Sequence, residues 1–137
     1  MIEKKYTSLT KALATLKKSL IIIEDPKNQH LYESLRDSVI QRFEYSIDTF
    51  WKFLKFYIQE TEKVDLEASS PRIILRQAET VGLIDKQQHE ILIDCLADRN
   101  LTSHVYNEET ADSILKNIPL YYETMKSITD KLNVKTK

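Results

Sequence analysis

The chain has 137 residues, 42% of them hydrophobic and 30% charged, which is typical of a single globular domain that buries a core without disulfides or a structural metal. One glycine and three prolines are too few for a sheet with tight turns and favour long helices with short connections. The net charge of −1 is not that of a strong nucleic-acid binder, and the single cysteine cannot form an internal disulfide, so a reducing compartment fits.

The first predicted element is an amphipathic helix that ends near Glu24. Four leucines at spacings of four, three and four share one of its faces: Leu9, Leu13, Leu16 and Leu20. The longest apolar run near the start of the chain covers residues 20–23, which is far too short for a membrane span or a signal-peptide core. We therefore expect a cytoplasmic protein. The polar segment 24–28, which contains Pro26, should break the helix.

A long second helix is predicted over residues 31–60. Its apolar side chains follow a helical period on one face: Val39, Phe43, Ile47, Phe50 and Leu54. We expect this helix to be the central element of the fold, with Trp51 in the core or in a dimer interface. The polar stretch 61–69 is predicted to be a loop.

A short third helix is bounded by recognisable start and stop signals. Ser70 is a good N-cap, Pro71 suits the first helical position, and Gly82 is well placed to end the helix. Asp85 and Gln88 have the spacing of a capping box, in which the side chain of each residue bonds the backbone N–H of the other. A fourth helix should therefore begin directly after Asp85.

The fourth and last helices complete the predicted fold. The fourth carries an apolar side formed by Ile91, Leu92, Cys95 and Leu96. Asn107 is predicted to cap the last helix, and Pro119 should kink it. The apolar face of that helix comprises Ile114, Ile118, Tyr121, Met125, Ile128 and Leu132. The sum is an all-α, antiparallel up-and-down bundle of four to five helices, forming one domain over residues 1–137.

Chemically capable side chains concentrate between the fourth and last helices. Arg99 is a permanent cation whose planar fork suits a phosphate, and His104 titrates near neutrality. Asn100 can hydrogen-bond and Tyr106 offers a hydroxyl that can be modified. Arg99 and His104 lie five positions apart, about 140° around a straight helix. They can meet only if the helix ends or bends here, or if a second subunit completes the site.

An acidic pair on the second helix, Glu44 and Asp48, has the spacing of neighbours on one helix face. We expect this pair to be an exposed surface feature. The alternative is that Glu44 faces the site around Arg99 and orients that side chain. No metal or cofactor is expected, because His30, His89 and Cys95 do not form a zinc pattern.

The motif and its surroundings resemble a known family. Arg99, Asn100, His104 and Tyr106 match the Arg-x4-His-x-Tyr motif of HEPN domains. Three blocks resemble the HEPN subfamily once labelled nucleotidyltransferase substrate-binding proteins: residues 36–45 with 51–52, residues 69–72, and residues 98–104. The resemblance covers roughly residues 5–133.

The resemblance implies a helical bundle that forms a homodimer, with the two motifs lining a shared cleft. It implies a metal-independent RNase toxin whose partner, a minimal nucleotidyltransferase, acts as the antitoxin. His104 would then be the general acid or base, Arg99 would stabilise phosphoryl charge, and Asn100 would orient the phosphate or His104. Tyr106 would be the site of AMP addition by the partner.

The charge distribution keeps two other interpretations open. Residues 85–112 contain seven acidic and two basic residues, which does not favour RNA at the motif. Lysines gather instead toward the two ends of the chain, at Lys4, Lys5, Lys11, Lys17, Lys18, Lys126, Lys131, Lys135 and Lys137. The chain could therefore be a non-catalytic substrate-binding subunit of a nucleotidyltransferase complex, or a purely structural dimeric bundle.

Overall fold

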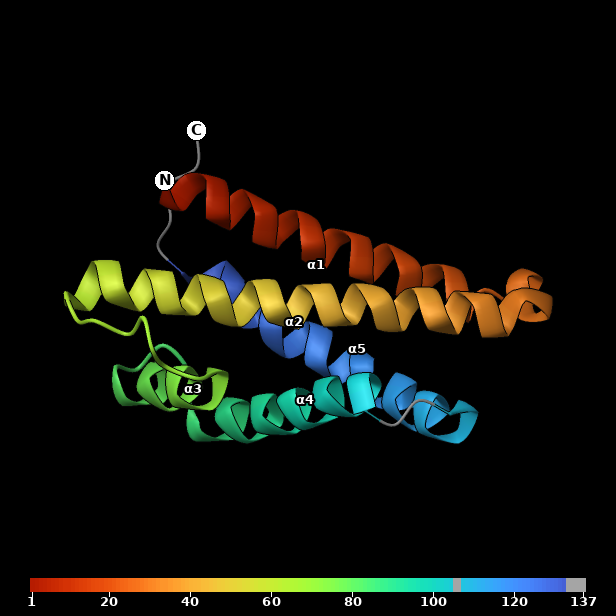
Figure 1. Ribbon diagram of the computed structural model, residues 1–137. Helices are drawn as coiled ribbons and strands as arrows, with labels where there is room; N and C mark the ends of the chain where they lie inside the picture. Colours follow the sequence, from red (N-terminus) through yellow and green to blue (C-terminus); the bar gives the residue numbers. More distant parts are fainter. Residues whose placement is uncertain (105–106, 133–137) are drawn as a thin grey trace.

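The computed structural model describes residues 1–104 and 107–132, and these residues form an all-helical fold (Figure 1). In chain order the elements are α1 (Ile2–Glu24), the 3₁₀ helix η1 (Pro26–Leu31), α2 (Tyr32–Glu62), α3 (Pro71–Thr80), α4 (Lys86–His104) and α5 (Glu108–Lys131). The four long helices α1, α2, α4 and α5 alternate in direction along the bundle (Figure 1). The predicted antiparallel up-and-down bundle is confirmed. The segment expected only to break the first helix forms η1.

The helix boundaries follow local hydrogen bonds that the sequence signals. The Ser70 side chain accepts from the backbone N–H of Ile73 at 3.4 Å, with Pro71 at the first helical position. Gly82 has a φ of 84°, a left-handed conformation that glycine adopts without steric cost. The side chain of Asn107 accepts from the backbone N–H of Thr110 at 2.8 Å and starts α5.

The predicted capping box at the start of α4 is confirmed in both directions. The backbone N–H of Gln88 donates to Oδ1 of Asp85 at 2.7 Å, and the backbone N–H of Asp85 donates to Oε1 of Gln88 at 2.9 Å. Two N–H groups that α4 itself cannot satisfy are thereby paired. This fixes the start of the helix that carries Arg99.

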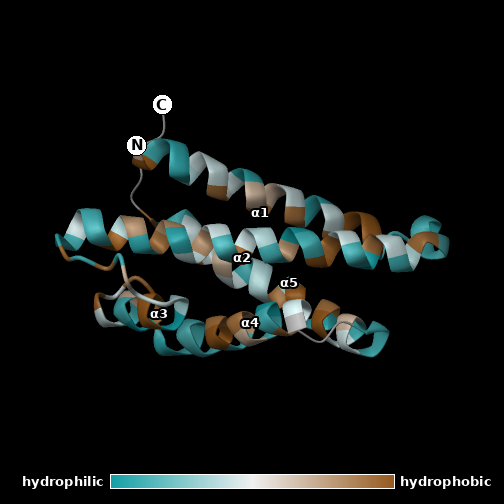
Figure 2. Cartoon of the chain, viewed as in Figure 1, coloured by the Kyte–Doolittle hydropathy of each residue, from teal (hydrophilic) through white to brown (hydrophobic). Residues whose placement is uncertain are grey.

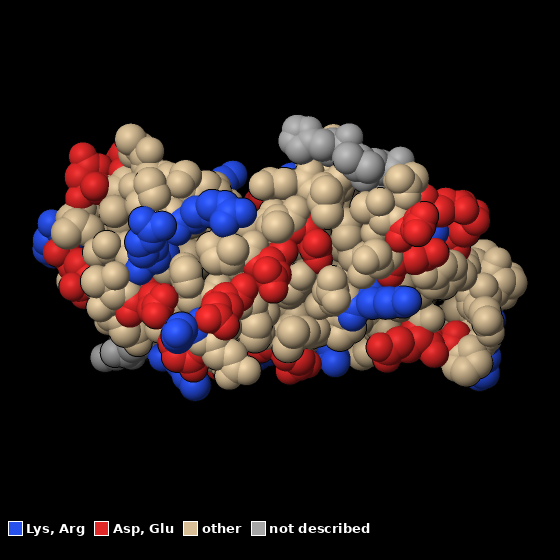
Figure 3. Space-filling view, turned by 90° about the horizontal axis from the view of Figure 1, so that it is seen from below, with Lys and Arg blue, Asp and Glu red and all other residues tan. Residues whose placement is uncertain are grey.

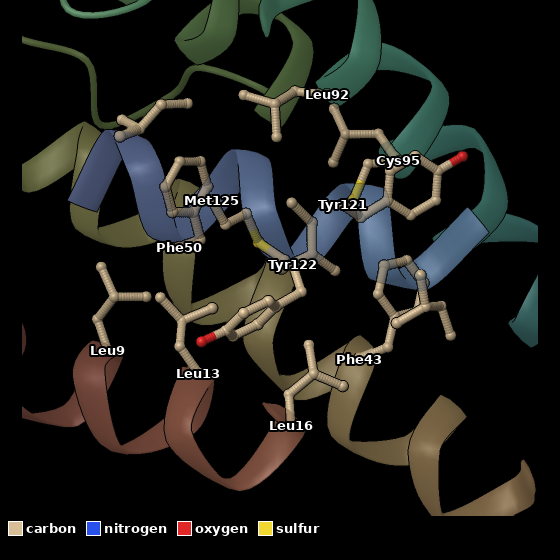
Figure 4. Close-up of a cluster of buried hydrophobic side chains, with 14 of the residues drawn as sticks. Leu9, Leu13, Leu16, Phe43, Phe50, Leu92, Cys95, Tyr121, Tyr122 and Met125 are labelled. Atoms are coloured by element: carbon tan, nitrogen blue, oxygen red, sulfur yellow. The ribbon is translucent and has the colours of Figure 1, made fainter. Parts of the chain in front are cut away.

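The core lies where α5 crosses between the α1–α2 hairpin and α4 (Figure 4). The largest fully buried side chains on α1 and α2 include Leu9, Leu13, Leu16, Phe43 and Phe50. Tyr121, Tyr122 and Met125 of α5 pack among them, and Cys95 of α4 is fully buried, as predicted (Figure 4). Apolar and polar residues alternate along α1, α2 and α5 (Figure 2), which is the amphipathic pattern that places apolar side chains in one core.

Two further expectations concern single residues. Trp51 is partly buried and packs against the core cluster, in agreement with the first of its two predicted environments. Pro119 lies inside α5, which continues on both sides of it, and the kink expected there stays a prediction. Among the described residues, no helix combines the length and the apolar character needed to cross a membrane.

Candidate functional site

Arg99 projects from the last turns of α4 onto two carboxylates of α2. Its guanidinium donates to both oxygens of Asp48, from Nε to Oδ1 at 3.3 Å and from Nη2 to Oδ2 at 3.0 Å. Its Nη1 donates to Oε2 of Glu44 at 3.1 Å. A fork-to-fork pair of this kind fixes the plane of the guanidinium as well as its position.

Two hydroxyls of α4 complete what we term the Arg99 cluster, namely Arg99, Glu44, Asp48, Thr102 and Ser103. Nη1 of Arg99 also donates to the hydroxyls of Thr102 at 3.3 Å and Ser103 at 2.9 Å. The Thr102 hydroxyl in turn donates to Glu44. Because a hydroxyl both accepts and donates, Thr102 links the cation to the carboxylate. The cluster therefore joins α2 and α4 by a continuous polar network.

The cluster has a formal charge of −1, the sum of one cation and two carboxylates. Hydrogen bonding to Asp48, followed by the charges of Asp48 and Glu44, raises the pKa of the Arg99 guanidinium. The side chains of Arg99, Glu44 and Asp48 are 25%, 28% and 36% exposed, so the cluster is open to solvent. The two carboxylates more than neutralise the guanidinium of Arg99. A phosphate that approached Arg99 would therefore also meet a carboxylate.

This arrangement corrects the expectation that Glu44 and Asp48 form an exposed surface pair. Both bind Arg99, which is the alternative stated for Glu44. The participation of Thr102 and Ser103 was not expected from the sequence. The signal that could have found them was their position, since residues three and four after Arg99 lie on its side of a helix.

The structure places the other predicted site residues as follows. Asn100 lies next to Arg99 on α4 and is exposed. His104 is the last residue of α4, and its side chain lies outside what the structure describes. Tyr106 lies outside the described residues altogether. Because α4 runs from Lys86 through His104, the helix does not end between Arg99 and His104, and the two positions differ by about 140° around its axis.

A second polar cluster fixes the first turns of α5, which begins directly after the motif. Arg36 of α2 is only 5% exposed, and its Nη1 donates to Oδ1 of Asp112 at 3.1 Å. The Tyr32 hydroxyl donates to the same oxygen at 2.7 Å. Nε of Arg36 donates to Asp37 at 3.2 Å. Arg36 is thus a buried cation paired on two sides, as buried charges require.

Acidic side chains run across the middle of the face shown in Figure 3. Between α4 and α5 the surface forms a hollow of about 260 Å³ lined in part by Asp94 and Asp98. Tyr121 donates its hydroxyl to Asp98 at 2.7 Å. Burial and this hydrogen bond raise the pKa of Tyr121. Within the described ranges, no three His, Cys, Asp or Glu side chains gather as metal ligands would.

Comparison with solved structures gives several similar helical proteins. A Thermus thermophilus protein is 37% identical, with a TM-score of 0.80 over 92% of this chain and 99% of that one. A Haemophilus influenzae protein, described as having the fold of a substrate-binding domain of a nucleotidyltransferase, is 24% identical, with a TM-score of 0.79 over 91% and 96%. A tri-AMPylated Shewanella oneidensis HEPN toxin in complex with MNT antitoxin is 19% identical, with a TM-score of 0.67 over 89% and 93%. At these last two identities the likeness concerns the fold.

No curated protein matches this chain. The family model described as nucleotidyltransferase substrate binding protein like matches residues 4–134, which is almost the whole chain. The resemblance seen in the sequence is confirmed, and the helical bundle has the fold of the HEPN toxin. The chain belongs to the nucleotidyltransferase substrate-binding-protein-like family.

Proposed function

We propose that this chain is the HEPN toxin of a toxin–antitoxin pair, and that it cleaves RNA without a metal and is neutralised by a minimal nucleotidyltransferase. The observation that carries the proposal is the fixed guanidinium of Arg99. Arg99 lies near the end of α4, and Asp48 of α2 holds its guanidinium in one plane. Arg99 is the first residue of the Arg-x4-His motif, and His104 is its histidine. The similar Shewanella oneidensis protein is a HEPN toxin bound to MNT antitoxin, which supports the same partnership here.

In the proposed reaction the 2′-hydroxyl of the RNA attacks the adjacent phosphorus, and the 5′-oxygen of the next nucleotide leaves. A 2′,3′-cyclic phosphate and a free 5′-hydroxyl result. His104 takes up the proton of the 2′-hydroxyl or supplies the proton of the leaving oxygen. Arg99 stabilises the charge that develops on the non-bridging oxygens. Asn100, exposed beside Arg99, orients the phosphate.

The charge of the Arg99 cluster determines how the phosphate would approach. Asp48 holds two nitrogens of the guanidinium, whereas Nη1 faces Glu44, Thr102 and Ser103. A phosphate oxygen would therefore replace Glu44 at Nη1 while Asp48 keeps the guanidinium in place. His104 would come from a second subunit, because the positions of Arg99 and His104 diverge on one continuous α4.

The partner would act on Tyr106, two residues beyond His104. Addition of AMP to its hydroxyl would place a phosphodiester charge and a nucleoside at the cleft. Like charge would then repel the phosphates of RNA. The AMPylated state of the Shewanella oneidensis toxin supports this means of neutralisation.

A second candidate function is a non-catalytic substrate-binding subunit of a nucleotidyltransferase complex. The observation that favours it is the formal charge of −1 in the Arg99 cluster, within a segment that is already acidic. In this function the cluster would fix α4 against α2 and so shape a docking surface for the enzyme.

The test is cleavage of total RNA by the purified protein in the presence of EDTA, with wild type beside His104→Ala. His89→Ala is the matched control, because His89 lies on the same helix ten positions before Arg99, where it contacts Glu79 of α3. We expect cleavage by wild type and by the control, with cyclic phosphate ends, and no cleavage by His104→Ala. If wild type cleaves no RNA but co-purifies with a minimal nucleotidyltransferase, the second function replaces the first.

A further inference from the structure

The seam between α1 and α2 contains two hollows at the surface. One, of about 270 Å³, is lined by Thr15, Lys18 and Ser19 of α1 and by Ser38 and Arg42 of α2. The other, of about 230 Å³, is lined by Lys5 and Ser8 of α1 and by Thr49 and Lys52 of α2. Only α1 lies away from α3 and α4, on the opposite side of α2 (Figure 1). Each hollow joins cations to small polar and to apolar side chains, since Ile22 and Leu35 also line the first hollow and Phe53 the second.

Both hollows open on the same face of the hairpin. On α1, Ser8 of one hollow and Thr15 of the other are seven positions apart, which is two helical turns. On α2, Arg42 and Thr49 have the same spacing. Tyr45 lies between them, three positions after Arg42, and is 59% exposed. We term the surface formed by these two hollows and Tyr45 the α1–α2 groove.

The α1–α2 groove is basic in a protein whose net charge is −1. No Asp or Glu lines either hollow. Within the part of the chain that the structure describes, its four cations make no ion pair: Lys5, Lys18, Arg42 and Lys52. The Arg99 cluster, by contrast, pairs its cation with two carboxylates. Unpaired cations at spaced positions are what a phosphate backbone requires.

Aromatic rings position two of these cations and leave one ring free. Lys5 Nζ lies 5.0 Å from the ring centroid of Phe56, and Lys52 Nζ lies 5.8 Å from that of Trp51. Such contacts restrain flexible ammonium groups without neutralising them. Tyr45 makes no ring contact with another described aromatic side chain, so its exposed face is free to stack on a base.

We propose that the α1–α2 groove binds single-stranded RNA. Lys5 and Lys52 contact phosphates at one end of the groove, Lys18 and Arg42 contact phosphates at the other end, and Tyr45 stacks on a base between them. The choice of RNA rests on the proposed function. Lys5 and Lys18 are separated by about 20 Å along α1, which matches several nucleotides. The groove also borders the candidate site, because Asp48, which binds Arg99, lies four positions before Lys52 of the groove on α2, and side chains at that spacing are neighbours on a helix. A strand held there leads toward the Arg99 cluster.

The experiment measures binding of a fluorescein-labelled 20-nucleotide uridine RNA by fluorescence anisotropy at several NaCl concentrations with EDTA. All proteins carry His104→Ala, so that cleavage does not consume the probe. The groove variant is Lys18→Gln with Arg42→Gln. The matched control is Arg72→Gln with Lys86→Gln, two exposed cations of α3 and α4 that lie outside the groove. Both variants lose the same charge from exposed positions, and circular dichroism checks that each is folded.

We expect the groove variant to bind about tenfold more weakly at low salt, with the slope of log affinity against log salt reduced by about 1.4. The control should bind within about twofold of the parent protein, and Tyr45→Ala should weaken binding about fivefold. Equal binding by groove variant and parent, or an equal loss in the control, overturns the proposal. So does equal competition by poly-L-glutamate, which would identify an acidic protein surface as the ligand.

Binding and cleavage separate the two proposals. If RNA binding depends on the groove cations but wild type cleaves no RNA, the groove proposal is supported and the proposed RNase function is refuted. If cleavage requires His104 but the groove cations have no effect on RNA binding, the RNase function is supported and the groove proposal is refuted.

Discussion

Replacement of Arg99 by methionine tests whether the Arg99 cluster stabilises the fold by charge compensation. Methionine keeps much of the aliphatic length of arginine but leaves Glu44 and Asp48 facing each other across one helical turn of α2 without a cation. The variant loses the two bonds to Asp48 and the bond to Glu44. It also removes the donor whose hydrogen bond the hydroxyl of Ser103 accepts.

The magnitude follows from the exposure of the three charged side chains, which ranges from 25% to 36%. Fully exposed ion pairs contribute ~0.2–1 kcal/mol, whereas removal of one partner from a buried pair costs ~3–5 kcal/mol. A partly exposed cluster with a bidentate pair lies between these limits. We expect Arg99→Met to lower the free energy of unfolding by about 1–2 kcal/mol, or Tm by roughly 4–8 °C.

The assay is urea unfolding followed by circular dichroism at one fixed protein concentration. Lys86→Met is the control, because Lys86 is an exposed cation of the same helix, and its effect should stay within about 0.5 kcal/mol. Adding Glu44→Gln and Asp48→Asn to Arg99→Met should recover part of the loss by removing the uncompensated charge. Arg99→Met as stable as wild type would refute the reasoning. A triple variant no more stable than Arg99→Met would assign the loss to packing instead.

Three further outcomes test other parts of the fold. Hydrogen bonds from Tyr32 and then Arg36 lower the pKa of Asp112, so its stabilising effect is present above the unfolded-state pKa and is lost as pH falls through the folded-state pKa. Wild type should therefore lose its stability advantage over Asp112→Asn in acid unfolding between about pH 5 and 2. Asp85→Ala removes half of the capping box and should cost about 1 kcal/mol in urea unfolding. Burial raises the pKa of the Cys95 thiol well above its ordinary value, so iodoacetamide should label it only in the unfolded protein, and labelling of the native protein at the rate of free cysteine would contradict this.

Much of the fold was predictable because the determining signals are local. The caps at Ser70, Asp85 and Asn107 each act on a backbone N–H three residues further along the chain, and each forms the expected bond. The apolar periods of α1, α2 and α5 identify their buried faces, since an amphipathic helix has only one side to bury. Segment 26–31 was less predictable, because a 3₁₀ turn and an irregular break contain the same residue types.

The candidate site was less predictable because its contacts are remote in sequence. Arg99 binds Asp48 across 51 positions, and only the packing of α4 on α2 brings them together. A pair of acids at helical spacing, such as Glu44 and Asp48, is usually exposed, so its pairing with Arg99 required the fold. Arg36 likewise pairs with Asp112 across 76 positions. Sequence identified the motif residues and offered Glu44 as an alternative partner of Arg99, whereas only the structure identified Asp48, Thr102 and Ser103.

The directions in which positions 99 and 104 point from α4, and the charge of the Arg99 cluster, together restrict how this motif could work. A continuous α4 directs positions 99 and 104 to different sides, so one subunit does not present both to the same phosphate. Because the Arg99 cluster has a charge of −1, Arg99 alone does not attract RNA. A phosphate that binds Arg99 must compete with Glu44 for the guanidinium. Attraction must then come from cations elsewhere, and the α1–α2 groove contains four that have no carboxylate partner among the described residues. In the proposed RNase, capture of the strand by the α1–α2 groove and cleavage at a site shared between subunits would satisfy both restrictions.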